Sequence, residues 1–141
     1  MYNIKQISSL QNPLVKKILL LKEKSRERKK TGLFVLEGLR ELELALKGSY
    51  KIKTLLYLDE LISEETISNL FHQAELPELI SLSKAVYQKL AYRETTEGII
   101  AIANSKPHVL EELKFTNENP LVLVAEAPEK PGNIGALLRT A

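Results

Sequence analysis

Short apolar segments alternate with amphipathic segments along most of the chain, and this alternation limits the fold more than any other feature. Four segments of four to seven residues are predicted to be strands, at residues 33–36, 52–58, 79–82 and 98–103. Helical spacing of apolar residues predicts helices at 39–47, from Ser63 to about Ala74, and from a cap at Ser83 through Leu90. Alternating strands and helices predict an α/β fold in which helices cover a sheet through right-handed crossovers.

A further helix is predicted near the N-terminus, where Asn12 is a good N-cap and Pro13 suits the first helical position. Apolar residues then recur at helical spacing, at Leu14, Ile18 and Leu21. The lysine and arginine residues lie mostly off this apolar stripe, so the helix is expected to have a basic outer face. We expect it to fray over residues 28–32, where Gly32 breaks the helix.

The basic charge is concentrated at the start of the chain. The 141 residues carry a net charge of +2, but residues 1–30 contain nine Lys or Arg and two Glu, a net charge of +7. A clustered basic segment on an acidic body predicts a polyanionic partner, most simply a nucleic acid; the alternative is a solvated helix face. The candidate phosphate-binding residues are Lys16, Lys17, Arg26, Arg28, Lys29 and Lys30.

The C-terminal part of the chain has a different organisation. Residues 105–119 are rich in turn-forming residues and are predicted to be a linker. Residues 121–125 (LVLVA) are predicted to be a strand buried on both faces, and Asn133 is predicted to cap a helix over 134–141. A lone strand–helix unit cannot bury its own faces. We therefore expect a complete domain at 1–104, a linker at 105–119, and the truncated beginning of a second domain at 120–141.

Gly132 and Gly135 stand three residues apart at the start of this last helix. Glycines here permit close approach of a ligand to the backbone, and a helix N-terminus offers free N–H groups to an anion. Arg139 lies one turn after Gly135 and could hold a phosphate bidentately. The alternative is a plain turn with a surface arginine. The pattern is neither a P-loop, because no Lys-Ser/Thr follows the second glycine, nor a complete dinucleotide fingerprint.

Glu37 and Gly38 form a second candidate site, because they lie between a predicted strand and a predicted helix. Gly38 could allow a sharp turn with Glu37 facing a ligand, but a simple turn with an exposed carboxylate is the favoured interpretation. Four tyrosines could stack on nucleobases, although packing in the core is favoured for them: Tyr50, Tyr57, Tyr87 and Tyr92.

Several other chemistries find no support in the sequence. Cysteine is absent, which excludes disulfides, thiolate metal sites and a cysteine nucleophile. The two histidines, His72 and His108, have no carboxylate at a spacing that suggests a metal site. No apolar run approaches the length of a transmembrane helix and no signal peptide is recognised, so a cytoplasmic protein is expected.

Four motifs occur in a specific order and spacing: SSLQNPLVK at 8–16, FVLEG at 34–38, GIIA at 98–101 and PGNIGALLRTA at 131–141. The first three resemble the substrate-binding domain of the SpoU (TrmH-type) RNA methyltransferases, a small ribosomal-protein-like α/β sandwich. The fourth resembles the first motif of the catalytic SPOUT domain of that family, which is an α/β knot. Many members carry Asp where Lys130 stands, a departure that concerns the subfamily.

The resemblance implies an enzyme that transfers a methyl group from S-adenosylmethionine to a ribose 2′-hydroxyl of rRNA or tRNA, as a homodimer and without a metal. It implies that Asn133 and Arg139 belong to the active site, and that Glu37 and Gly38 belong to the RNA-binding domain. Because a guanidinium stays protonated, Arg139 would hold an RNA phosphate and stabilise developing alkoxide charge instead of acting as a base. Asn133 would cap the helix, shape the loop or hydrogen-bond Arg139.

The cofactor-binding motifs of this family lie further toward the C-terminus and do not occur in these 141 residues. We therefore expect this chain alone to be inactive and to bind S-adenosylmethionine weakly or not at all. The alternative function is a non-catalytic RNA-binding protein of the ribosomal-protein type, which would have no need of the motif at 133–141.

Overall fold

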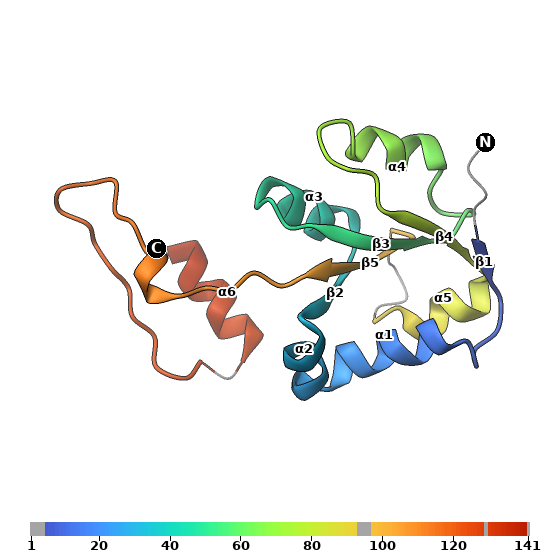
Figure 1. Cartoon of the computed structure of the whole chain (residues 1–141), viewed down its shortest axis with the longest axis horizontal. Coiled ribbons are helices and arrows are strands. Elements are labelled where there is room, and N and C mark those ends of the chain that lie inside the picture. Colours follow the sequence, from blue (N-terminus) through green and yellow to red (C-terminus); the bar gives the residue numbers. More distant parts are fainter. Residues whose placement is uncertain (1–4, 93–96, 129, 141) are drawn as a thin grey trace. The chain divides into compact units, whose positions relative to one another are not determined.

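The computed structural model describes residues 5–92, 97–128 and 130–140 (Figure 1). The chain divides into two compact units, Met1–Pro107 and His108–Ala141. The first contains a sheet covered by helices, and the second contains a short 3-10 helix, η1 (Leu110–Glu112), and one α-helix, α6 (Pro131–Thr140).

A five-stranded mixed sheet forms the centre of the first unit, with the strands in the order β1-β4-β3-β5-β2. The strands are β1 (Lys5–Ile7), β2 (Leu33–Glu37), β3 (Ile52–Tyr57), β4 (Glu78–Leu82) and β5 (Ile99–Asn104). The strands β1, β4 and β3 run parallel, whereas β5 is antiparallel to both of its neighbours, β3 and β2. The predicted α/β class is confirmed, and β1 is a strand that the sequence did not predict.

Helices cover both faces of this sheet: α1 (Pro13–Glu23), α2 (Ser25–Thr31), α3 (Leu39–Lys47), α4 (Glu64–Leu70) and α5 (Lys84–Leu90). Figure 1 shows α1 and α5 on one face and α3 and α4 on the other. Two apolar clusters result, one for each face, and β5 contributes to both because its alternate residues point to opposite sides. Ile100 and Ile102 pack under α1 and α5, while Ile99, Ala101 and Ala103 face α3 and α4.

The predicted N-caps Asn12 and Ser83, and the predicted helix start at Ser63, are confirmed by hydrogen bonds from the first turn of each helix. The Asn12 side chain accepts from the Leu14 N–H at 2.8 Å, and Pro13 follows it as the first helical residue. The hydroxyls of Ser63 and Ser83 accept from the N–H groups of Thr66 and Val86. The helix α4 ends at Leu70, earlier than predicted, because the N–H groups of Phe71, His72 and Ala74 close tighter turns on carbonyls three residues back.

The predicted fraying of the first helix over residues 28–32 is wrong, because this segment forms the separate helix α2. Lys24 adopts an extended conformation that separates α1 from α2. At the other end of α2, Gly32 has the left-handed φ of 63° and its N–H bonds to the carbonyl of Arg28 at 2.9 Å. Gly32 is therefore the terminator that the sequence predicted, but of a second helix.

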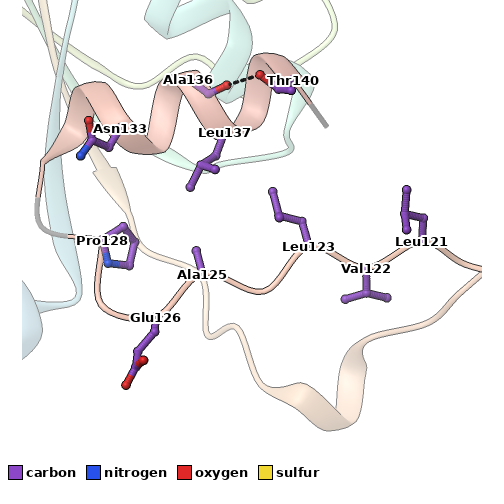
Figure 2. A pocket seen from close by; sticks show the side chains of 10 residues that line it. All are labelled: Leu121, Val122, Leu123, Ala125, Glu126, Pro128, Asn133, Ala136, Leu137 and Thr140. Carbon is purple, nitrogen blue, oxygen red and sulfur yellow. Dashed lines mark hydrogen bonds between the residues drawn. The ribbon is translucent and has the colours of Figure 1, made fainter.

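In the second unit, the predicted buried strand at 121–125 is wrong. This segment is exposed and has no strand partner among the described residues. Figure 2 shows that it is nevertheless extended, because Leu121 and Leu123 point to the side of α6 and Val122 points away. An apolar run becomes a sheet strand only where a neighbouring strand completes its hydrogen bonds.

The helix α6 begins at Pro131, earlier than predicted. The N–H groups of Asn133 and Ile134 bond to the carbonyl of Lys130. Asn133 therefore lies inside the first turn of the helix and is not its N-cap, which corrects the sequence prediction. Ala141, which the predicted helix included, lies outside the described residues.

Candidate functional site

Four basic side chains of α1 and α2 are exposed and form what we call the basic surface: Lys16, Arg26, Lys29 and Lys30. Three of them stand three and four residues apart on α2, so they share one side of that helix. The four ion pairs found among the described residues engage Lys5, Lys22, Lys51 and Lys84. No described carboxylate therefore pairs with the basic surface, and Lys17, which is partly buried on α1, is also without one.

Arg28 was grouped with these residues in the sequence analysis, but the structure gives it a different environment. Its guanidinium Nη1 donates to the carbonyl of Leu21 at 2.7 Å and to that of Lys22 at 3.1 Å. These carbonyls belong to the last turn of α1, where a helix leaves its acceptors without partners inside the helix. Arg28 thus caps α1, and part of its donor capacity is used within the protein.

Glu37 is the last residue of β2, and its carboxylate is not the exposed group that the favoured interpretation expected. Its side chain is 16% exposed, and Oε2 lies 3.1 Å from the Lys22 ammonium of α1. Both carboxylate oxygens accept the Tyr92 N–H, at 2.7 and 3.0 Å. Lys22 also donates to the carbonyl of Leu90, the last residue of α5, at 2.5 Å. Glu37 and Lys22 therefore join α1, β2 and the end of α5.

Gly38 forms the sharp turn that its sequence position predicted. Its φ is +108°, and a Cβ atom there would lie 2.6 Å from the Glu41 carboxylate. The N–H of Gly38 bonds to the carbonyl of Ile99 in β5, and the N–H of Leu39 bonds to the Glu97 carboxylate at the start of α3. Gly38 is buried, so its role is to let the backbone turn between β2 and α3, and it is not exposed to a ligand.

The tyrosines divide into two groups. Tyr57 and Tyr87 are buried: the Tyr57 hydroxyl donates to Glu64, and the Tyr87 hydroxyl accepts the Gly98 N–H. Burial raises the pKa of the Tyr57 hydroxyl, and the bonded Glu64 carboxylate raises it further. Tyr50 packs edge-on against Phe34. These three tyrosines therefore pack within the domain, as the sequence analysis favoured, whereas Tyr92 is 83% exposed.

Neither a metal cluster nor a membrane span is found in the part of the chain that the structure describes. No three His, Asp or Glu side chains there are grouped so that they could hold an ion, and His72 bonds through Nδ1 to the carbonyl of Asn69. No described helix is both long enough and apolar enough to cross a bilayer.

In the second unit, α6 carries the four residues of the predicted catalytic motif: Gly132, Asn133, Gly135 and Arg139. Asn133 and Arg139 are six residues apart, which on an α-helix means about 9 Å along the axis and about 120° around it. The structure records no hydrogen bond between these two described side chains, and the direct contact that was one of the predicted roles of Asn133 stays a prediction. Gly135 and Arg139 are four residues apart and share one side of the helix.

A cleft of about 820 Å³ runs between residues 121–128 and α6 (Figure 2). Its lining is mainly apolar, with Leu123 and Leu137 pointing into it from opposite sides, and Asn133 stands at one end. Arg139 does not line the cleft. A Cβ atom at Gly132 or Gly135 would meet no described atom within 4 Å, so packing inside this unit does not require either glycine.

An α/β sandwich with basic helices on its surface belongs to a class of domains suited to binding a polyanion. Residues 12–101 match the MRM3-like substrate binding domain, and the chain belongs to this family of SpoU/TrmH-type RNA methyltransferase domains. The family assignment that the sequence motifs suggested is thereby confirmed.

Three known proteins illustrate the similarity. The chain is 32% identical to the Bacillus subtilis 23S rRNA (guanosine(2553)-2′-O)-methyltransferase RlmP over 138 residues, which is 98% of this chain and 50% of that protein. The solved structure of an RNA 2′-O ribose methyltransferase is 34% identical, with a TM-score of 0.75. The match covers 96% of this chain and 50% of the chain in that structure. An AdoMet-bound rRNA methyltransferase from Sinorhizobium meliloti is 26% identical, with coverages of 78% and 40% and a TM-score of 0.61. The chain spans about half the length of its relatives.

Proposed function

We propose that this chain is the RNA-binding domain and first catalytic segment of an enzyme that methylates ribose 2′-hydroxyls of rRNA or tRNA in the cytoplasm. One observation carries the proposal. The similarity to the Bacillus subtilis rRNA methyltransferase extends over 98% of the chain and so includes both units. The alternative, a non-catalytic RNA-binding protein of the ribosomal-protein type, accounts for the first unit but gives no reason for the second.

In this proposal, residues 1–104 recognise RNA, residues 105–119 are a linker, and residues 120–141 begin the methyltransferase domain. Two features support these boundaries. The division between the compact units falls after Pro107, close to the end of β5. The exposed apolar residues of 121–124 lie in the second unit, close to the proposed start of the methyltransferase domain.

The basic surface is proposed to bind phosphates of the RNA backbone. Exposed lysine and arginine side chains without carboxylate partners are free to displace the counterions that surround RNA. This contribution is independent of base sequence, so it positions the RNA without selecting the nucleotide. Three further candidate residues are partly or fully buried: Lys17, Glu37 and Gly38. They are proposed to support RNA binding indirectly, by holding the surrounding backbone in position.

The proposed reaction is an in-line displacement. The ribose oxygen would form a bond to the methyl carbon of S-adenosylmethionine as the bond from that carbon to sulfur breaks. S-adenosylhomocysteine would leave, and the hydroxyl proton would pass to water. S-adenosylmethionine supplies the methyl group, and a homodimer is the expected active form. A guanidinium is not a useful base, so the proposed role of Arg139 is to hold the neighbouring phosphate and stabilise charge on the attacking oxygen. Asn133, in the first turn of α6, shapes the start of the helix. The glycines leave room for close approach of another backbone or a ligand.

The cleft beside α6 is open and mainly apolar, and the later cofactor-binding motifs of the family are not in these 141 residues. This chain alone is therefore proposed to be inactive and to bind S-adenosylmethionine weakly or not at all. A micromolar dissociation constant from calorimetric titration of the chain would contradict this part of the proposal.

The RNA-binding role is tested by charge reversal on α2. The variant changes Arg26, Lys29 and Lys30 to Glu and leaves the cap Arg28 in place. A matched control changes the three exposed basic residues Arg40, Lys47 and Lys53 to Glu, which lowers the net charge equally. Each phosphate contact contributes about 0.7–0.9 to the log–log slope of affinity against salt. We expect the α2 variant to flatten this slope by more than the control, and equal behaviour of the two variants would contradict the assignment.

A further inference from the structure

Tyr92 is the one tyrosine, of the four that the structure describes, whose ring is largely open to solvent. Isolated exposed apolar side chains are common and need no explanation by themselves. Tyr92 differs from such residues because its backbone is held in place and because a cation lies beside its ring.

Two side chains, those of Glu37 and Lys22, hold the backbone that leads into Tyr92. The Tyr92 N–H bonds to both oxygens of the Glu37 carboxylate, so the end of β2 holds it. Two residues earlier, the carbonyl of Leu90 accepts a hydrogen bond from the Lys22 ammonium of α1. The side chains of Lys22 and Glu37 are only 22% and 16% exposed, so their ion pair is partly shielded from water, whereas the hydrogen bond from the Tyr92 N–H lies at the surface. These hydrogen bonds define the backbone position from which the ring is presented before any ligand arrives, which lowers the entropic cost of binding.

Lys22 also connects Tyr92 with the basic surface. Its ammonium lies over the Tyr92 ring, 5.9 Å from the centroid. Its backbone carbonyl accepts a hydrogen bond from Arg28 of α2, the helix that carries Arg26, Lys29 and Lys30. One residue, Lys22, thus contacts both the exposed ring and the helix that bears the basic surface.

We propose that Tyr92 stacks on an unpaired nucleobase of the RNA whose phosphates lie on the basic surface, with Glu37 as its positioning residue. This inference rests on the proposed RNA-binding function and adds a base-contacting site to it. A nucleobase has a flat π-face that stacks on an aromatic ring, and its attached phosphates need nearby cations. An apolar protein partner fits less well, because the residues next to Lys22 toward α2 include the exposed charges of Lys24 and Arg26. Unpaired bases are also the part of RNA that proteins read most often.

The chain contains no tryptophan, which makes a direct test possible. In the Tyr92→Trp variant of the whole 141-residue chain, the indole is the single tryptophan fluorophore. A single-stranded oligoadenylate is titrated in, and so is the same oligonucleotide with abasic positions, which keeps the phosphates and removes the bases. We expect the oligoadenylate to quench the indole fluorescence strongly and the abasic strand to leave it nearly unchanged.

The affinity of Tyr92→Ala supplies the second measurement. Loss of one stacked base should weaken oligoadenylate binding by about 5- to 150-fold. Affinity for the abasic strand and the salt slope should stay unchanged, because no charge is removed. Tyr92→Phe should bind like the unmodified chain, and Leu44→Ala, at an exposed apolar residue of α3, is the matched control.

Three results would overturn the inference. If the unmodified chain binds RNA with a steep salt slope but Tyr92→Ala binds equally well, the stacking site is wrong and the RNA-binding function stands. Equal quenching by the abasic strand would also exclude base stacking. If the unmodified chain binds neither strand, the RNA-binding function and the stacking site both fail.

Discussion

Arg28 and Leu21 belong to different helices, yet the guanidinium of Arg28 lies 2.7 Å from the Leu21 carbonyl and completes the end of α1. A basic residue that looks like part of an RNA-binding cluster in the sequence is therefore also a structural cap. The distinction separates the stability of the domain from its affinity for RNA, and it can be tested by comparing Arg28 with its exposed neighbour Arg26.

Replacing Arg28 by Ala should lower the free energy of unfolding by about 1–3 kcal/mol, because hydrogen bonds from a charged donor to two partly buried carbonyls are lost. Urea denaturation followed by circular dichroism measures this. Arg26→Ala removes the same charge from an exposed position of α2 and should change stability by less than about 0.5 kcal/mol. Equal effects of the two substitutions would show that Arg28 is not a cap.

Gly38→Ala should destabilise the first unit by about 1–3 kcal/mol, because the backbone there has a φ that side-chain-bearing residues rarely adopt. The atom nearest to the new Cβ is the flexible end of Glu41, which can move away. The double variant with Glu41→Ala should therefore recover little of the loss. Full recovery in thermal or urea unfolding would assign the effect to the clash with Glu41 instead of the backbone.

Glu37→Ala should cost about 1–3 kcal/mol of stability, because it leaves the shielded Lys22 ammonium without its carboxylate and the Tyr92 N–H without its acceptor. Glu37→Gln keeps an oxygen acceptor of the same length, so more of the Tyr92 contact should survive. Affinity for oligoadenylate should follow the same order, with Gln closer to the unmodified chain than Ala. An RNA affinity that is equal in both variants would remove Glu37 from its positioning role.

Arg139→Lys, in a complete enzyme that contains this chain, should retain RNA affinity but reduce single-turnover methyl transfer on the order of a hundredfold or more. Lysine keeps the charge and loses the planar fork that holds a phosphate bidentately. Arg139→Ala should be at least as slow, and Lys130→Ala serves as a control that removes a nearby cation outside α6. If the Arg139 variants transfer methyl groups at the rate of the unmodified enzyme, Arg139 is a structural residue. If they lose RNA affinity but keep the rate of methyl transfer, Arg139 is a binding residue.

Sequence reasoning succeeded where the signal is local. The caps at Asn12 and Ser83 and the helix start at Ser63 depend on atoms two or three residues away, and the helix Leu39–Lys47 was predicted with both of its ends. It failed where the signal is distant. The strand β1 exists because Lys5–Ile7 pairs with Ile80–Leu82, and three residues show no pattern of their own. Residues 121–125 have the right composition for a strand but no described partner.

The same division applies to the candidate site. Composition was enough to find the basic residues of α1 and α2, because clustered charge is visible along the sequence. The cap formed by Arg28 depends on the break at Lys24, which no breaker residue marks. The group formed by Lys22, Glu37 and Tyr92 brings together residues 15 and 55 positions apart, and only the folded sheet places them in contact. The Asn133 and Arg139 roles remain predictions.

The position of β5 has a consequence for how the protein is made. This strand is the last of the first unit to leave the ribosome, yet it lies between β3 and β2 and takes part in both apolar clusters. The edge strand β2 therefore has no strand partner while about 60 further residues are synthesised, until β5 is complete. Chains that stop before Ile99 should remain sensitive to protease, and protection should appear in one step once the ribosome has released Asn104.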